Sequence, residues 1–173
     1  PRCYIGWINE RGPSMALQMA SDPTCGTCRA NSGELSAPGG AIYQDTCWRL
    51  EHILPPIPLA GWLVLKPLRH VEALADLSRE EAATFGPLIQ RTTAAMRAVL
   101  QPARIYLCQF SEAEGFAHIH FHLIPRTTDV PAELRGPAVF DLLSTSRREG
   151  RDLASPQEAE RIAREVREQL PFS

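Results

Sequence analysis

The sequence has no long apolar run, no excess of charge of one sign and few cysteines, and each lack excludes a class of protein. No stretch reaches the roughly 20 apolar residues that a transmembrane helix needs, and the first residues, PRCYIGWINERG, lack the apolar core of a secretory signal. A formal net charge of -2 gives no overall attraction to nucleic acid or to an acidic membrane surface. We therefore expect a cytoplasmic protein that binds neither nucleic acid nor membrane.

The five cysteines are few for the length of the chain, and their number is odd, so a disulfide framework explains them poorly. Metal binding or plain burial fits better. Apolar residues make up 44% of the chain and charged residues 22%, as in an ordinary globular protein. A length of 173 residues suits one domain with a single core.

Composition divides this single domain, residues 1–173, into three parts. Residues 1–40 are rich in Gly, Pro, Ser and Asn, and we expect irregular structure there. Residues 41–126 form the core. Residues 127–173 form a Pro-, Arg- and Ser-rich extension in which 139–143 is the one candidate ordered piece before a final helix.

Local patterns predict the elements of the core. Ser78 and Glu81 form a capping box ahead of apolar residues at helical spacing, so a long helix should begin there, although Pro87 predicts a kink or a later start. A second helix should run from Ser155 to about Leu170. This order of elements favours an α+β domain with an antiparallel sheet and a helix on one face. Strands are predicted at 41–44, 46–53, 62–68, 103–110 and 116–126.

The stretch FAHIHFHLIPR, residues 116–126, holds three of the five histidines at every second position. On a strand, His118, His120 and His122 would share one face. At about 3.3 Å per residue the outer two lie roughly 13 Å apart, too far to share one metal, so at least one imidazole stays free for nucleophilic or proton-transfer chemistry. The alternative is a polar strand face without function. The other face would join the core through Ala117, Ile119, Phe121 and Leu123.

Cys25-Gly-Thr-Cys28 is a second motif with several explanations. It fits half of a structural zinc site, a thiol redox pair, or two unrelated buried cysteines. The redox pair needs a helix N-terminus, and the following RANSGEL is a poor helix opening. Zinc needs two further ligands, for which His52, His70 and the three alternating histidines are the candidates.

The segments AHIHFHLI (117–124) and GWLVLKPLRHVEAL (61–74) resemble the motifs of the histidine triad (HIT) family of nucleotide hydrolases and transferases. The resemblance covers roughly residues 25–126. It implies a five-stranded antiparallel sheet with a long helix, assembled as a homodimer. It also implies that His120 attacks the α-phosphorus of a nucleotide and that His122 supports the phosphate and the leaving group. A structural zinc ion would be held by Cys25, Cys28, His70 and His118.

The turn before the histidines departs from the family pattern. SEAEGFA (111–117) carries Glu112 and Glu114 where the family has neutral donors to phosphate, and a carboxylate there costs on the order of 1 to 4 kcal/mol beside a phosphate. Trp62 stands where the family has a histidine, which removes a polar group near the site. The residues expected to contact substrate are Gln109, Glu114, Gly115 and Phe116.

The leading hypothesis is therefore a HIT-type hydrolase or nucleotidyl transferase that cleaves a phosphoric anhydride or phosphoramidate bond of a small-molecule substrate, a nucleotide. One alternative is acid/base chemistry on a non-nucleotide substrate, and another is a non-catalytic, zinc-stabilised binding module. Among single residues, we expect Trp48 and Trp62 in the core, His52 on a strand surface and Lys66 solvated.

Overall fold

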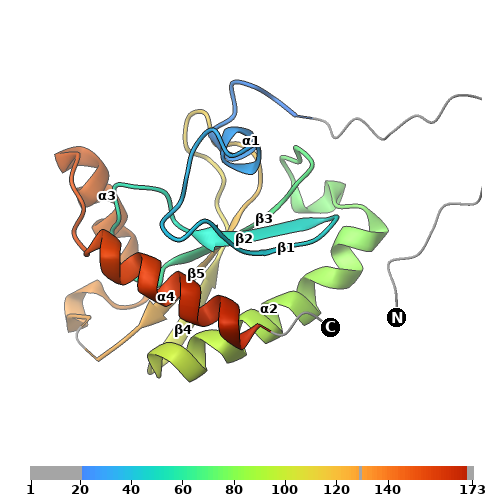
Figure 1. The fold of residues 1–173 in the computed structure, drawn as a ribbon. Helices are drawn as coiled ribbons and strands as arrows, with labels where there is room; N and C mark the ends of the chain where they lie inside the picture. The colour runs from blue at the N-terminus through green and yellow to red at the C-terminus, as the bar shows by residue number, and fades with distance from the viewer. Residues whose placement is uncertain (1–20, 129, 171–173) are drawn as a thin grey trace, which may run out of the picture.

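The computed structural model describes residues 21–128 and 130–170, and in it one antiparallel sheet forms the centre of the fold (Figure 1). The five strands lie in the order β1-β2-β3-β5-β4, which confirms the predicted α+β fold. Half of the predicted irregular segment 1–40 lies outside the described residues. The strands are β1 (Ala41–Gln44), β2 (Trp48–His52), β3 (Leu63–Pro67), β4 (Arg104–Cys108) and β5 (Phe121–Arg126).

One face of the sheet is apolar and packs against two helices, α2 (Arg79–Leu100) and α4 (Pro156–Gln169). The alternation of strand side chains produces this face, since the residues that point to it are mainly apolar and buried: Trp48 and Leu50 of β2, Leu63 and Leu65 of β3, and Phe121 and Leu123 of β5. Figure 1 shows α4 crossing below the sheet, beside α2. The central residues of this core are Leu50, Leu63, Leu65, Phe121, Leu123, Leu88, Met96, Ile162 and Val166.

Both long helices begin where their capping residues predict. The Ser78 side chain accepts from the Glu81 N–H, and the Glu81 carboxylate accepts from the Ser78 N–H, so the capping box is complete. The helix continues through Pro87, so the predicted later start was wrong. Ser155 likewise caps α4 by accepting from the Glu158 N–H.

The opposite face carries two short helices that the sequence did not predict in full. A six-residue helix, α1 (Gly26–Asn31), begins directly after Cys25, where irregular structure was expected. The extension forms α3 (Phe140–Glu149), which runs well beyond the expected residues 139–143. The part of the chain that the structure describes also contains three short 3-10 turns: η1 (Leu74–Asp76), η2 (Ala132–Leu134) and η3 (Gly136–Val139).

The histidine stretch is only partly a strand. β5 begins at Phe121, so His118 and His120 precede it, because the Ile119 N–H donates to the Val71 carbonyl and not to a neighbouring strand. The prediction that alternate residues of this stretch join the core is confirmed for Ile119, Phe121 and Leu123, which are buried, whereas Ala117 is exposed. Among the helices of the described residues, none combines the length and apolar character of a membrane span.

Candidate functional site

A cavity of about 440 Å³ opens on the sheet face that α2 and α4 leave uncovered, a size typical of small-molecule sites. Side chains of β2, β3 and β5 that point away from the apolar core form its floor, among them Glu51, Lys66 and His122. Its walls come from α1, the turn around Glu114, and Arg147 of α3. The cavity therefore joins segments that lie far apart in the sequence.

His120 borders this cavity with a defined tautomer. Its Nδ1 lies 2.9 Å from the carbonyl oxygen of His118, and a carbonyl can only accept, so Nδ1 carries the proton. The Nε2 atom of the neutral ring is then an unprotonated nitrogen with a free lone pair. Ser111 holds the backbone of this residue, since its hydroxyl accepts from the His120 N–H at 3.2 Å.

His122 lies beside His120, with ring centroids 4.9 Å apart, and has the opposite tautomer. The indole N–H of Trp62 donates to His122 Nδ1 at 3.0 Å, so the proton of the neutral imidazole sits on Nε2. Trp62 is fully buried, as predicted. The sequence suggested that Trp62 removes a polar group from the site. In the structure its indole N–H is itself a polar group of the site, because it donates to His122.

Both rings are neutral near pH 7. Burial, with smaller contributions from the neighbouring His120 and Arg147, lowers the pKa of His122 to about 3. Burial also lowers the pKa of His120, with Lys66 and Arg147 adding to the shift and the hydrogen bond to His118 opposing it. The pair thus presents one unprotonated nitrogen and one neutral N–H donor.

The predicted substrate residues divide between the cavity and its support. Glu114 and Phe116 line the cavity. Gln109 instead donates its side-chain amide to the Ser111 hydroxyl at 3.0 Å, so it acts on His120 through Ser111. Gly115 takes a positive φ of 73° in the turn and accepts from the Gly26 N–H at 2.7 Å.

The four residues predicted to bind metal come together beside the cavity. One ligand atom from each of Cys25, Cys28, His70 and His118 lies within 4.8 Å of all the others. From Cys28 Sγ, the distances to Nδ1 of His70 and of His118 are 3.3 and 3.5 Å. Zinc bond lengths of about 2.3 Å to sulfur and 2.05 Å to nitrogen give roughly 3.6 Å for an S···N edge of a tetrahedron. The cluster is able to hold a metal ion of this kind.

One further contact favours a metal over a redox pair. The outer Nε2 atom of His70 lies 3.2 Å from a Glu72 carboxylate oxygen, the kind of contact that orients a metal-binding imidazole. The argument from a poor helix opening was wrong, since α1 begins here, and the contact between His70 and Glu72 replaces it.

The cluster also supports the cavity wall. A Cβ atom on Gly26, between the two cysteines, would lie 2.3 Å from the Phe116 ring, so only glycine permits this contact. Thr27, also between the cysteines, lines the cavity itself. The segment that carries the two cysteines therefore also forms part of the cavity wall.

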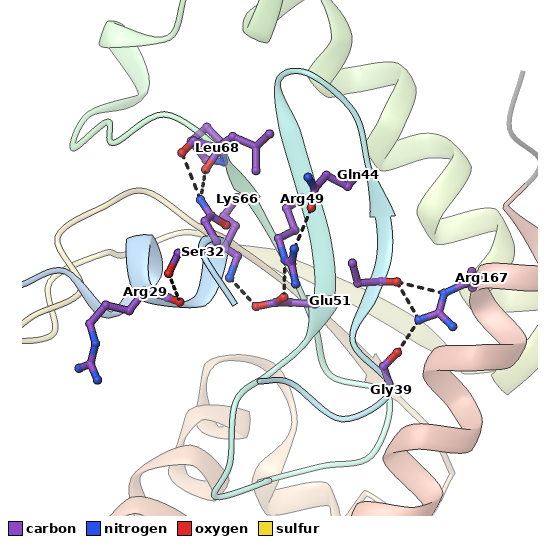
Figure 2. A network of polar contacts seen from close by, with 12 residues as sticks. Arg29, Ser32, Gly39, Gln44, Arg49, Glu51, Lys66, Leu68 and Arg167 are labelled. Atoms are coloured by element: carbon purple, nitrogen blue, oxygen red, sulfur yellow. Dashed lines mark hydrogen bonds and ion pairs between the residues drawn. The ribbon is translucent and has the colours of Figure 1, made fainter. Parts of the chain in front are cut away.

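Three polar residues that line the cavity, Glu51, His52 and Lys66, are buried and paired, which was not expected for His52 and Lys66. Lys66 is 3% exposed and forms an ion pair with Glu51, which also accepts from Arg49 at 2.7 Å (Figure 2). Burial lowers the pKa of Lys66, and the Glu51 carboxylate opposes that shift. His52 is fully buried, and both its ring nitrogens bond to backbone, to Gly61 N–H and to the Ile53 carbonyl. The predictions of a solvated lysine and a surface histidine were wrong.

Two residues of the site were missed at the level of sequence. Ser111 lies in the acidic turn, where the charged residues Glu112 and Glu114 are the more conspicuous candidates. Arg147 lies in the extension, more than twenty residues after the histidines, where no motif draws attention to it. The sequence signal that could have indicated Arg147 is its position near the end of a short helix that begins at Phe140, and this signal is weak.

Comparison with known proteins supports the fold. No protein-family model matches the sequence, and no curated protein matches it. A zinc-bound histidine triad family protein from Mycobacterium smegmatis has a TM-score of 0.59 at 22% identity, covering 84% of this chain and 92% of that one. A histidine triad nucleotide-binding protein from Sulfolobus tokodaii has a TM-score of 0.61 at 15% identity, with coverages of 84% and 91%. A diadenosine triphosphate hydrolase from Plasmodium falciparum has a TM-score of 0.52 at 16% identity, and each chain covers 74% of the other.

Proposed function

We propose that this chain, which has the fold of histidine triad proteins, hydrolyses or transfers a nucleotidyl group with His120 as the nucleophile. The observation that carries the proposal is the His120 ring, whose Nδ1 donates to a carbonyl while the side chain borders the cavity. Two of the proteins with similar structures are a histidine triad nucleotide-binding protein and a diadenosine triphosphate hydrolase, and this similarity is the reason to choose a nucleotide as substrate.

In the proposed reaction, the lone pair on His120 Nε2 attacks the α-phosphorus of the nucleotide. The N–P bond forms as the bond from phosphorus to the leaving group breaks, and its electron pair goes to the leaving group. Water or another acceptor then attacks the same phosphorus, and the electron pair of the N–P bond returns to Nε2. The Nδ1–H bond to the His118 carbonyl keeps the ring in the orientation that both steps need.

His122 supplies the neighbouring donor in this scheme. Trp62 holds its Nε2–H as a neutral hydrogen-bond donor, which can stabilise developing charge on the phosphoryl or leaving-group oxygen without first losing a proton. A neutral donor also avoids placing a permanent positive charge beside the nucleophile. The two tautomers together therefore suit attack at phosphorus.

We assign zinc, with a structural role, to Cys25, Cys28, His70 and His118, because their donor set and spacing fit its tetrahedral preference. When bound, zinc would cross-link α1 to the segment that precedes β5. His118 precedes His120 by two residues, and its backbone carbonyl accepts the hydrogen bond from His120 Nδ1–H. A zinc ion that holds His118 in place would therefore also fix the orientation of the His120 ring.

The proposal is tested by His120→Ala, assayed with diadenosine polyphosphates and adenosine phosphoramidates. Turnover should fall by at least about 10³-fold, while zinc content and Tm stay close to those of the parent, since the side chain is only half-buried. Full activity in His120→Ala, or no cleavage of either substrate class by the parent chain, would overturn it. The second result would favour the non-catalytic binding module.

A second candidate rests on Glu114, which lines the same cavity as the two histidines. Acid/base chemistry on a non-nucleotide substrate would use this carboxylate, and Glu114→Gln would then abolish activity. Phosphoryl chemistry gives the opposite expectation, because removing a negative charge beside a phosphate should leave the rate unchanged or raise it. The sign of the change separates the two candidates.

We also propose a homodimer formed through the edge of the sheet. β4 is an edge strand, and Leu107 on it and Phe110 just beyond it are 46% and 57% exposed. An unpaired edge with exposed apolar side chains favours self-association. Light scattering on Leu107→Lys should show the monomer where the parent chain shows the dimer.

A further inference from the structure

Arg147 is a charged residue of the cavity that the proposed reaction leaves without a role. It lies in the last turn of α3, and that helix is fixed to the sheet by Val139 and Leu143, which pack with Trp62 and Ile124. Phe140 at the start of the helix contacts the His122 ring at a centroid distance of 5.4 Å. The position of the arginine is therefore set by packing against the same residues that orient His122.

The Arg147 side chain lies in the same cavity as His120 and His122. Its Cζ atom lies 6.0 Å from the centroid of the Phe116 ring, in the range of a cation–π contact, and the side chain lines the cavity with His120 and His122. Phe116 in turn packs on Gly26, which lies between the two cysteines of the metal cluster, and this packing fixes the other side of the contact.

Arg147 is also the cation of this cavity whose charge is not already neutralised. Lys66 is paired with Glu51 in the floor. None of the ion pairs found among residues 21–128 and 130–170 includes Arg147. Basic residues are common at helix C-termini, but that explanation serves Arg148 equally, and Arg148 is occupied by the Thr145 hydroxyl at 3.4 Å.

Resting on the proposed function, we infer that Arg147 binds the leaving group of the nucleotide and that it makes the site select substrates whose leaving group is itself a phosphate. Attack by His120 Nε2 breaks the bond between the α-phosphorus and the bridging oxygen. The electron pair goes to that oxygen, and the leaving nucleotide departs as a phosphate anion. A guanidinium group pairs with such an anion through charge-assisted hydrogen bonds.

An amine leaving group makes a different demand. It departs from a phosphoramidate as the bond from phosphorus to nitrogen breaks, and it must take up a proton, which an arginine does not supply. Arg147 therefore stabilises departure of a phosphate and gives no help to departure of an amine. The two substrate types share the nucleotidyl group attacked by His120, so they differ only in the part that Arg147 contacts.

The test compares diadenosine triphosphate with adenosine 5′-phosphoramidate on the parent chain, Arg147→Ala, Arg147→Lys and the control Arg148→Ala. Arg147→Ala should lower kcat/KM for diadenosine triphosphate by about 10- to 100-fold and for the phosphoramidate by less than about 3-fold. Arg147→Lys should restore part of the loss, because it keeps the charge. Arg148→Ala should stay within about 2-fold of the parent on both substrates.

Equal losses on the two substrates, or no loss on either, would overturn the role of Arg147 while leaving the proposed function in place. A parent chain that cleaves neither substrate would overturn both. Arg147 is exposed, so the alanine variant should fold, and an unchanged Tm checks that point.

Discussion

Three histidines around the cavity each keep one ring proton, and their neighbours decide which nitrogen carries it. The His118 carbonyl places the proton of His120 on Nδ1, and the Trp62 indole places that of His122 on Nε2. His52 donates from Nδ1 to the Ile53 carbonyl and accepts at Nε2 from the Gly61 N–H. Because burial keeps all three neutral, these hydrogen bonds determine the chemistry that each ring can perform.

Trp62→Phe tests the assignment for His122. The change keeps an aromatic ring and removes the N–H that holds Nδ1, so kcat should fall by about 10- to 100-fold, as for other orienting partners. The free energy of unfolding should fall by about 1 to 3 kcal/mol, because a buried acceptor loses its donor. Steady-state kinetics and ¹⁵N shifts of the His122 ring measure the two effects.

Trp48→Phe is the matched control for this change. Its indole donates to the Thr84 hydroxyl at 3.0 Å, on the face of the sheet that packs against α2. We expect Trp48→Phe to lower the free energy of unfolding about as much as Trp62→Phe does and to leave kcat unchanged. If both variants lose kcat alike, or neither does, the orienting role of Trp62 is wrong.

His52 should make stability depend on pH. Burial lowers its pKa to about 4 in the folded chain, against an unfolded value of 6.5. The unfolded chain therefore binds a proton between these values while the folded chain does not, so stability is full above pH 6.5 and falls as the pH drops toward 4. The difference of about 2.5 pKa units corresponds to about 3 kcal/mol.

Urea unfolding of the parent chain and of His52→Gln, from pH 7 to pH 4, checks this expectation. The other buried histidines titrate in both chains, so the difference between the two slopes isolates His52. Identical slopes would show that His52 contributes nothing to the pH dependence.

At the level of elements, the sequence predicted those with strong local patterns. The strands of the sheet have alternating apolar residues, and the capping residues Ser78 and Ser155 mark the helix starts. Tertiary contacts decide the rest. α1 has no side-chain cap and is held by the Gly26 N–H on Gly115, and β5 starts late because the Ile119 N–H bonds to Val71.

The same reason explains how much of the site was predictable. The histidines and Cys-x-x-Cys stand out because of their spacing, and matching to known motifs was enough to find the four clustered ligands. α3 has a polar sequence and no side-chain cap at Val139, so its helix depends on Phe140 and Leu143 packing against the sheet. Arg147 could not be placed before that packing was known.

Phe140→Ala tests whether α3 supports the site. The ring contacts Trp62 and His122 at centroid distances of 5.3 and 5.4 Å, so its loss should lower the free energy of unfolding by about 1 to 3 kcal/mol and lower kcat. Leu142→Ala, on the same helix and in the same apolar cluster, is the control and should cost stability with little effect on kcat. Equal effects on kcat would mean that α3 acts through stability alone.

At the scale of the whole molecule, the metal cluster links the N-terminal segment to the cavity. Cys28 and His118 belong to segments ninety residues apart, and Phe116 packs between the cluster and the cavity. Metal binding at this cluster would therefore be coupled to folding and to the shape of the cavity wall.

Cys28→Ser should abolish zinc binding, lower Tm by about 10 °C and raise KM, because α1 and the wall at Phe116 lose their anchor. Elemental analysis, a thermal melt and steady-state kinetics measure the three effects. Cys108→Ser, which alters a half-buried cysteine outside the cluster, should leave all three unchanged. Retention of zinc by Cys28→Ser would contradict the assignment of the ligands.

The central claim is that the lone pair of His120 becomes bonded to phosphorus during turnover. Rapid quenching at alkaline pH of a single turnover of diadenosine triphosphate, followed by peptide mass spectrometry, tests it most directly. We predict an adenylyl group on the peptide that contains His120, formed and lost at rates that account for kcat, and absent from His120→Ala. Turnover that proceeds without this adduct, or an adduct on another residue, would contradict the account.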